Sequence, residues 1–397
     1  MKAVLAIAIE DRVDLWFRDL EGTERSRRIS TEIPEKSEYC TEVHDLLRDM
    51  LGDLCTTIAG GARELFSNAA AVVVSSPGVI EAHRKLLQIP LWNSDMAQDK
   101  RVHWTLSGET IDGFDFREVL SEIGVKLIQA QGKSWSPLSR RSFEERVYVV
   151  NDATACAAFE HSQRNDPDPD FLYIKAHNGI NVGIIQPGRD GRSERADKWH
   201  PEAGHGFPRR QDYDFKAGFE GICPFHESCY EGYMAAKSFV QRALDAGSVT
   251  FEAWRTPLNK LKLQGLSGQK LDNAFLQYLL GDEENPPGAQ GEGVKIIGHY
   301  VGLLALQLSL PLAPKQIVIG GRMATAEVID EARENILDWV QDYPSRRVLT
   351  TREGLAEHIV PSVALESDKD TIEVQGAMAI AVLRAQDLAR NHSSFRE

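Results

Sequence analysis

A cluster of cysteine and histidine residues constrains this chain more than any other feature of its sequence. Cys223, His226 and Cys229 are spaced three residues apart, and His205 lies 18 residues before the first of them. Two thiolates and two imidazoles are a ligand set that Zn²⁺ binds tetrahedrally, and four protein ligands make a closed, structural site. We therefore expect residues 200–232 to fold around a structural zinc ion. The alternative is a polar loop in which Cys and His cluster without a metal.

Two glutamates lie within the same stretch. Glu202 precedes His205 by three residues, and Glu231 follows Cys229 by two. A metal-anchored loop would hold these carboxylates rigidly, and rigid carboxylates are suited to accept hydrogen bonds from neighbouring hydroxyl groups. The segment thus points to recognition of a sugar. The local sequence leaves equally open that either glutamate supports a metal-bound histidine or is solvated.

The composition is that of an acidic globular protein. The chain has 397 residues, of which 42% are hydrophobic and 26% charged, and its formal net charge is −14. This length suffices for two or more domains, and the negative charge disfavours a general nucleic-acid-binding surface. The N-terminal apolar run predicts a strand and not a signal peptide, because the run is followed by the acidic residue Glu10 and not by a cleavage site of small residues. The apolar tract at 294–310 contains Lys295 and His299, so we expect a buried helix and no membrane span.

The remaining cysteines give no disulfide pattern. Cys40, Cys55 and Cys156 lie outside the predicted metal set, and they are odd in number. Reduced thiols in a cytoplasmic protein are the expected state.

Strand-like and helix-like patterns alternate along the chain, which favours an α/β fold. A hairpin is expected over residues 4–17, and two buried strands are expected to end at Pro77-Gly78 and at Asn151-Asp152. The other expected elements are strands at 171–174, 182–185 and 317–319 and helices at 43–59, 153–161, 237–246, 294–310 and 371–385.

These landmarks together resemble the ROK family, which contains sugar kinases and sugar-responsive repressors. The shared order is strand–Pro-Gly, Asn-Asp, Gly-rich turn, Glu-x-Gly-His, zinc loop and late Gly-Gly turn, over nearly the whole chain. The loop at 223–232, CPFHESCYEG, is most similar to that of bacterial ROK fructokinases. The resemblance implies an actin-like, hexokinase-like (ribonuclease H-like) α/β fold of two domains around a central cleft. We expect residues 1–150 plus 380–397 to form one domain and residues 151–379, with the zinc loop, to form the other.

The resemblance also assigns roles to single residues. Asp152 would be the catalytic base, because a carboxylate at a strand end can take the proton from an attacking hydroxyl. On local sequence alone, Asp152 is instead expected to cap the following helix. The residues expected to bind the sugar are Asn151, Asp152, Glu202, His205 and Glu231. The expected zinc ligands are His205, Cys223, His226 and Cys229, and the expected nucleotide-binding glycines are Gly179, Gly320 and Gly321.

The nucleotide-binding turns depart from the kinase pattern. Kinases of the family begin with Asp-x-Gly-Gly-Thr, whereas this chain has Ala8 at the Asp position and Glu10-Asp11-Arg12 in place of Gly-Gly-Thr. Two carboxylates repel a polyphosphate, and their backbone lacks the freedom of glycine. The later turns are His177-Asn178-Gly179 and Gly320-Gly321-Arg322, where kinases have Gly-Thr-Gly and Gly-Gly-Gly. We therefore expect ATP and Mg²⁺ to be used poorly.

Three functions stay open at this point. The favoured one is recognition of a sugar or sugar derivative, as a sensor or with a repurposed activity, without efficient ATP use. The second is an active ATP-dependent sugar kinase of the fructokinase or glucokinase type, with Asp152 as base. The third is a structural partner that uses the zinc loop for dimer contacts.

The resemblance further implies a homo-oligomer, such as a dimer. Because the first strand is expected from residue 3, we expect no helix-turn-helix and no nucleic-acid partner. Segments 91–137 and 250–290 have no counterpart in the family core, and we expect them to cap the cleft or to build an oligomer interface.

Overall fold

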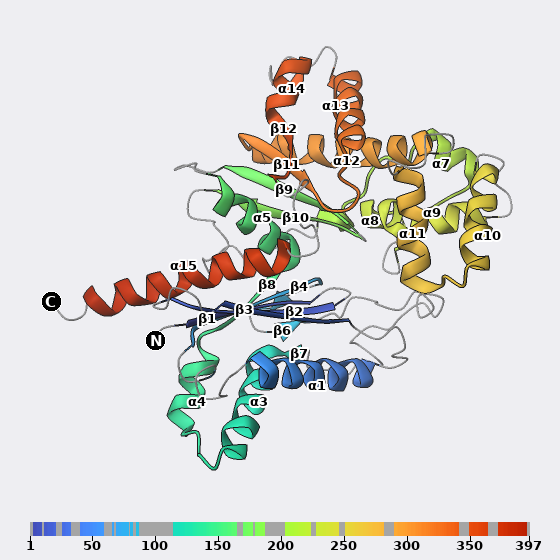
Figure 1. Ribbon diagram of the computed structural model, residues 1–397. Coiled ribbons are helices and arrows are strands. Elements are labelled where there is room, and N and C mark those ends of the chain that lie inside the picture. The colour runs from blue at the N-terminus through green and yellow to red at the C-terminus, as the bar shows by residue number, and fades with distance from the viewer. Residues whose placement is uncertain are drawn as a thin grey trace, which may run out of the picture.

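Two β-sheets, stacked with helices between and outside them, organise the molecule (Figure 1). The computed structural model describes residues 3–9, 12–20, 26–32, 40–58, 66, 69–78, 80–81, 85–86, 114–164, 170–177, 179–186, 203–223, 228–245, 251–281, 290–340, 349–363 and 372–394. Within them, one sheet has five strands, one has four, and a small third sheet has three: β5 (Ile80–Glu81), β6 (Lys85–Leu86) and β7 (Phe114–Asp115).

The five-stranded sheet has the order β3-β2-β1-β4-β8. β1 (Ala3–Ile9) and β2 (Arg12–Asp19) form the predicted antiparallel hairpin, which β3 (Ser26–Glu32) extends. β4 (Ala69–Ser76) and β8 (Val147–Asn151) lie parallel to β1 on its other side. Ser76 pairs with Asn151, so the turn after β4 and the start of the helix after β8 lie side by side at the carboxyl ends of these strands.

The four-stranded sheet repeats this plan in the order β10-β9-β11-β12. β9 (Phe171–Ala176) and β10 (Ile180–Ile185) form an antiparallel hairpin. β11 (Gln316–Gly320) and β12 (Ile359–Pro361) continue the sheet in parallel. In this register Lys175 of β9 pairs with Gly320 of β11. Hairpins extended by parallel strands confirm the predicted α/β class.

Helices α5 (Asp152–Gln163) and α15 (Ile372–Ser394) lie between the two sheets (Figure 1). The two helices pack against each other, and α15 also packs against β1 and β4. The division into residues 1–150 plus 380–397 and residues 151–379 stays a prediction. The remaining described helices are α1 (Cys40–Ile58), α3 (Phe116–Ala130), α4 (Pro137–Glu144), η2 (Ala203–His205), α7 (Asp212–Ala217), α8 (Tyr230–Met234), α9 (Ala236–Leu244), η3 (Glu252–Trp254), α10 (Arg255–Leu263), α11 (Gly268–Leu280), α12 (Gln290–Leu312), α13 (Ala326–Val340) and α14 (Arg352–His358).

The sequence of β1, AVLAIAI, explains the layered packing. Successive side chains of a strand point to opposite faces, and a strand covered on both faces is apolar throughout. Leu5, Ile7 and Ile9 pack with residues of α1 and α3, whereas Val4, Ala6 and Ala8 pack with residues of α5 and α15. Because α3 belongs to this core, at least the 116–130 part of segment 91–137 covers the sheet; residues 91–113 lie outside the described residues.

The predicted apolar helix at 294–310 is α12. Among the described residues, one helical segment, Gly291–Leu312, is long and apolar enough to cross a membrane, and 56% of its most apolar window is buried inside the protein. It packs against α11 and α13. The helix was expected to end at residue 310, but it includes Pro311 and ends at Leu312. Ala313 follows with a φ of 49°, a left-handed conformation that terminates helices.

Candidate functional site

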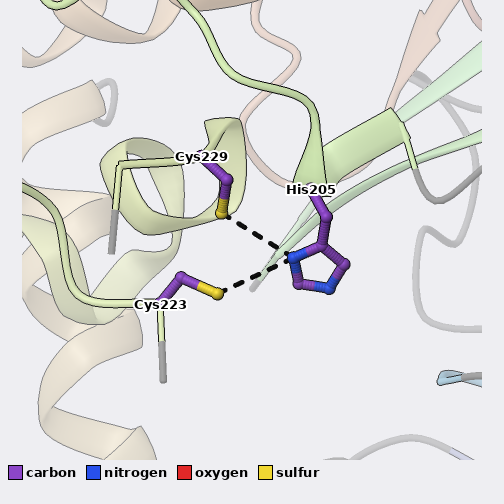
Figure 2. A group of neighbouring side chains, drawn as sticks. All are labelled: His205, Cys223 and Cys229. Carbon is purple, nitrogen blue, oxygen red and sulfur yellow. Dashed lines mark hydrogen bonds between the residues drawn. The ribbon is translucent and has the colours of Figure 1, made fainter. Parts of the chain in front are cut away.

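Three of the four predicted zinc ligands meet in one place (Figure 2). The side-chain ligand atoms of His205, Cys223 and Cys229 all lie within 4.8 Å of one another. The Sγ atoms of both cysteines are 3.7 Å from Nδ1 of His205. Zinc bond lengths at a tetrahedral angle give an S···N separation of about 3.6 Å. These residues therefore form a possible His/Cys/Cys metal site whose donor set and spacing fit Zn²⁺. His226 and Glu202 lie outside the described residues.

Backbone hydrogen bonds of the short helix α8 bring the three ligands together. Cys229 caps this helix, and its Sγ accepts the Gly232 N–H at 3.3 Å. The Tyr230 N–H donates to the carbonyl of Gly206, next to His205, at 3.0 Å. The Ile222 N–H, next to Cys223, donates to the carbonyl of Gly232 at 3.0 Å. The first turn of α8 thus anchors the three segments that carry the ligands.

The thiols of Cys223 and Cys229 are buried next to each other, so without a cation they stay protonated. Both cysteines are buried. A hydrogen bond with Cys223 raises the pKa of Cys229 well above its ordinary value, and burial adds to the effect. Bound Zn²⁺ would hold both sulfurs as thiolates, and structural zinc contributes its binding free energy to folding.

His205 lies between the two candidate metal-binding thiols and Glu231. While Nδ1 faces the two thiols, Nε2 lies 3.6 Å from Oε2 of Glu231, within ion-pair range but beyond hydrogen-bond distance. Metal binding at Nδ1 places the ring proton on Nε2, on the side of the carboxylate. On its other side Glu231 meets the turn after β9, because a Cβ added to Gly179 would lie 3.4 Å from Oε1. Glu231 therefore lies between the candidate metal ligand His205 and a predicted nucleotide-binding glycine.

The Asn151-Asp152 pair lies at the junction of β8 and α5, as predicted. Asn151 is the N-cap of α5, and its Oδ1 accepts the Ala153 N–H at 2.9 Å. Its Nδ2 donates to the carbonyl of Gly78 at 3.2 Å, which joins the turn after β4 to the start of α5. Oδ1 of Asp152 also accepts the Ala153 N–H, at 2.8 Å. The N-cap is therefore Asn151, whereas local sequence had suggested Asp152, which is instead the first residue of the helix.

The structure adds two residues to the candidate site that the sequence analysis missed. Nζ of Lys175 donates to Oδ2 of Asp152 at 2.7 Å and lies 2.8 Å from Oε1 of Glu373. All three residues are buried. The signal that could have identified Lys175 is a lysine in the otherwise apolar strand FLYIKA. A buried ammonium needs a carboxylate partner, and Glu373 is one of the two that it has.

The predicted nucleotide glycines Gly320 and Gly321 have a packing role. Gly321 has a φ of +98°, and a Cβ there would lie 2.3 Å from the carbonyl oxygen of Ala176. A Cβ on Gly320 would lie 2.0 Å from the hydroxyl of Tyr173. The turn after β11 thus needs both glycines to lie against β9, and their contact with a nucleotide stays a prediction.

Strand β10 connects the two parts of the site. A Cβ on Gly183 would lie 2.2 Å from the carbonyl oxygen of Ala153, so β10 lies directly against the start of α5. A Cβ on Gly204 would lie 1.9 Å from the carbonyl oxygen of Ile180, so η2 lies against the beginning of β10. Asp152 and the His205–Glu231 pair are therefore positioned by the same strand.

Known proteins resemble this chain in sequence. The model of the ROK family matches residues 136–381. A fructokinase of Streptococcus mutans is 26% identical over 207 residues, which are 52% of this chain and 56% of that protein. A fructokinase of Lactococcus lactis is 25% identical over 198 residues, 50% of this chain and 53% of that protein. The matches span just over half the length of these relatives.

Solved structures share the fold of the chain. A ROK family glucokinase from Streptomyces griseus, in complex with glucose and AMPPNP, superimposes with a TM-score of 0.56 at 16% identity, covering 94% of this chain and 97% of the other. A ROK hexokinase from Thermus thermophilus superimposes with a TM-score of 0.53 at 17% identity, covering 97% and 99%. Together with the two sheets, these likenesses confirm the predicted actin-like, hexokinase-like α/β fold.

Proposed function

Because this chain belongs to the ROK family, we propose that it is a carbohydrate-binding protein that recognises a hexose or hexose derivative without efficient use of ATP. The observation that carries the proposal is the position of Glu231. Its carboxylate is held between His205 and Gly179, and its side chain keeps 38% of its surface exposed. A fixed, accessible carboxylate can accept hydrogen bonds from two neighbouring sugar hydroxyls.

The proposed sugar site combines this carboxylate with the start of α5. Asn151, Asp152 and Glu231 would bind sugar hydroxyls, with His205 beside them and Glu202 from the segment outside the described residues. Zn²⁺ would be held by His205, Cys223 and Cys229, with His226 as the fourth ligand. In this role the metal supplies no chemistry to the ligand and only fixes the loop that carries Glu231.

Two features support poor use of ATP. The first is the set of altered turns, in which Glu10 and Asp11 replace glycines that would let the backbone approach phosphate. The second is the environment of Asp152. Its Oδ1 accepts the Ala153 N–H and its Oδ2 accepts the Lys175 ammonium, and both donors stabilise the negative charge. A carboxylate stabilised in this way is a weaker proton acceptor for an attacking hydroxyl.

The second candidate is an ATP-dependent sugar kinase. It is favoured by the relatives, which are named fructokinases, and by the retained Asn151-Asp152 pair at the end of β8. In this case Asp152 would take the proton from the sugar hydroxyl that attacks the γ-phosphate, and the turns at 177–179 and 320–322 would contact the nucleotide.

Calorimetry with D-fructose and D-glucose, each with and without ATP-Mg²⁺, separates the two candidates. Recognition without ATP use predicts hexose binding that the nucleotide does not change, and no sugar-dependent release of ADP. Sugar-dependent ADP release with tight ATP binding would reject it and support the kinase. Binding of neither hexose nor nucleotide would reject both candidates.

A pair of variants tests the proposed role of Glu231. Glu231→Gln should weaken hexose binding about 10- to 100-fold, because a hydrogen bond to a charged group contributes about 1.5–3 kcal/mol. The matched control is Glu220→Gln, whose side chain is 70% exposed and 3.8 Å from Arg210. Equal hexose affinities of the two variants would show that Glu231 does not bind the sugar.

We further propose a cytoplasmic homo-oligomer that does not bind nucleic acid. The net charge of −14 supports the last point, because a nucleic-acid-binding surface needs an excess of Lys and Arg. Light scattering coupled to gel filtration measures the oligomeric state, and a monomer at all concentrations would reject this part of the proposal.

A further inference from the structure

Lys175 joins two consecutive elements of the chain to a third one about 200 residues further on. It lies on β9, Asp152 begins α5, and Glu373 lies in the first turn of α15. Its ammonium is 2.7 Å from Oδ2 of Asp152 and 2.8 Å from Oε1 of Glu373. The three residues are 5%, 7% and 6% exposed, so this ion triad is nearly excluded from solvent.

Other titratable groups surround the triad. The Cys156 thiol of α5 donates to Oε1 of Glu373 at 3.4 Å. Tyr173 of β9 has a pKa raised well above its ordinary value, first by burial and then by the charges of Cys156, Glu373 and Glu160. These neighbours are acidic, and the Lys175 ammonium contacts both Asp152 and Glu373.

We propose that Lys175 is a positioning residue for Asp152: shared with Glu373, its ammonium keeps the Asp152 carboxylate ionised and fixed at the start of α5. A carboxylate has about four lone-pair sites, so each oxygen can still accept a hydrogen bond from a ligand. The consequence for ligand binding rests on the proposed function. The electrostatic role of Lys175 does not, because it depends only on the buried charges.

Removal of the ammonium has a distinct consequence. Lys175→Met leaves Asp152 and Glu373 as buried carboxyl groups in one site without the Lys175 ammonium between them, and such a pair retains a proton that the unfolded chain gives up. The folded variant then binds more protons than the unfolded chain, so its stability falls as the pH rises. A loss of packing alone would lower stability equally at every pH.

The test is urea unfolding of the ligand-free protein at several values between about pH 6 and pH 8.5, where free carboxyl groups are ionised. Relative to wild type, the folding equilibrium constant of Lys175→Met should fall by up to about tenfold per pH unit, as expected for one extra bound proton. The double variant Lys175→Met/Glu373→Gln should lose most of this slope, because one carboxyl group is gone. The control is Glu160→Gln on the same helix, a buried carboxylate paired with Arg164 at 2.6 Å, which should keep the wild-type slope.

A pH-independent difference between Lys175→Met and wild type, or a double variant with the same slope as the single one, would overturn the proposal. If Lys175→Met does not fold, the double variant decides. Its folding at neutral pH supports the charge imbalance as the cause, and its failure to fold overturns it.

Hexose affinity separates this proposal from the proposed function. With D-fructose or D-glucose as the probe, Lys175→Met should bind at least tenfold more weakly than wild type at pH 6, where the shared proton is held, and recover toward pH 8.5. If wild type binds neither sugar while the stability pattern holds, the proposed function fails and the electrostatic role of Lys175 stands. If wild type binds and the variant matches it at every pH, the positioning role fails and sugar recognition stands.

Discussion

Gly376 of α15 lies directly against the backbone of Ala155 in α5, so closely that a Cβ on Gly376 would come 1.8 Å from the Ala155 carbonyl oxygen. Gly376 follows Glu373 by three residues, about one helical turn. The close crossing of these two helices therefore sets where Glu373 meets Lys175 and Asp152. A small residue in a helix thus controls the geometry of a charge cluster near the candidate site.

Gly376→Ala should destabilise the protein. The added methyl group overlaps backbone that cannot move without separating α15 from α5, and overpacking of this kind costs about 1–3 kcal/mol or more. Urea unfolding measures the change. The control is Gly52→Ala in α1, where a Cβ would meet nothing within 4 Å and helix propensity predicts a gain of about 1 kcal/mol. A stable Gly376→Ala variant would show that the two helices separate easily.

The metal site predicts about one zinc ion per chain, measured by elemental analysis of the purified protein. Cys229→Ser should lose the metal, because it removes one of the three candidate ligands His205, Cys223 and Cys229. It should lower stability and hexose affinity together. The control is Cys55→Ala, a buried cysteine that is not in the described ligand set and should retain the zinc. Unchanged hexose affinity in a zinc-free variant would contradict the anchoring role of the metal.

The cysteines should differ in their reactivity toward a thiol reagent. Burial raises the pKa of Cys55 to about 12, so this thiol is protonated below that pH and is expected to stay unmodified in the folded protein. Cys223 and Cys229 should become reactive after a chelator removes the metal, because the loop that carries them then loses its anchor and exposes both thiols to solvent. Mass spectrometry of alkylated peptides identifies the modified residues. Labelling of Cys55 before Cys223 and Cys229 would contradict this order.

Restoring the kinase sequence of the first hairpin should improve nucleotide binding. The triple variant Ala8→Asp/Glu10→Gly/Asp11→Gly removes two carboxylates from the turn, adds the single carboxylate that kinases of the family carry at the end of the first strand, and restores the glycines that let the backbone approach phosphate. Affinity for ATP-Mg²⁺, measured by calorimetry, should rise by at least about tenfold, since each like-charge contact costs on the order of 1–4 kcal/mol. An unchanged affinity would show that this turn is not the obstacle.

A buried ion pair supports the segment that carries the candidate metal ligands. Arg242 of α9 donates to both carboxylate oxygens of Asp214 in α7, at 2.8 and 3.0 Å, and neither side chain is exposed. Tyr300 of α12 donates to the same carboxylate at 2.7 Å. Asp214→Ala should cost about 3–5 kcal/mol, because it leaves the guanidinium buried without its partner. Tyr300→Phe should cost about 1–3 kcal/mol in the same unfolding experiment, and equal costs would argue against the ion pair as the dominant interaction.

Features that depend on neighbours in the sequence were predictable. Two apolar runs separated by a charged turn indicated the β1–β2 hairpin, and a long apolar tract indicated the helix α12, because a short buried strand and a long buried helix are both recognisable from their own residues. The spacing of Cys223 and Cys229 indicated a metal-binding loop, because ligands a few residues apart can face one ion. The position of the Asn151-Asp152 pair was predictable because an apolar run ends at these two polar residues, which marks the end of β8.

The partners of Asp152 were decided by the tertiary structure. Lys175 lies on the strand that follows α5, and Glu373 lies on a helix far along the chain. Their contact requires both the position of β9 beside α5 and the close approach of α15 at Gly376. A sequence shows that a lysine interrupts an apolar strand, but charges are neutralised through space. Local patterns therefore identified the groups that carry the chemistry, whereas long-range packing chose which charges meet and how strongly each one is held.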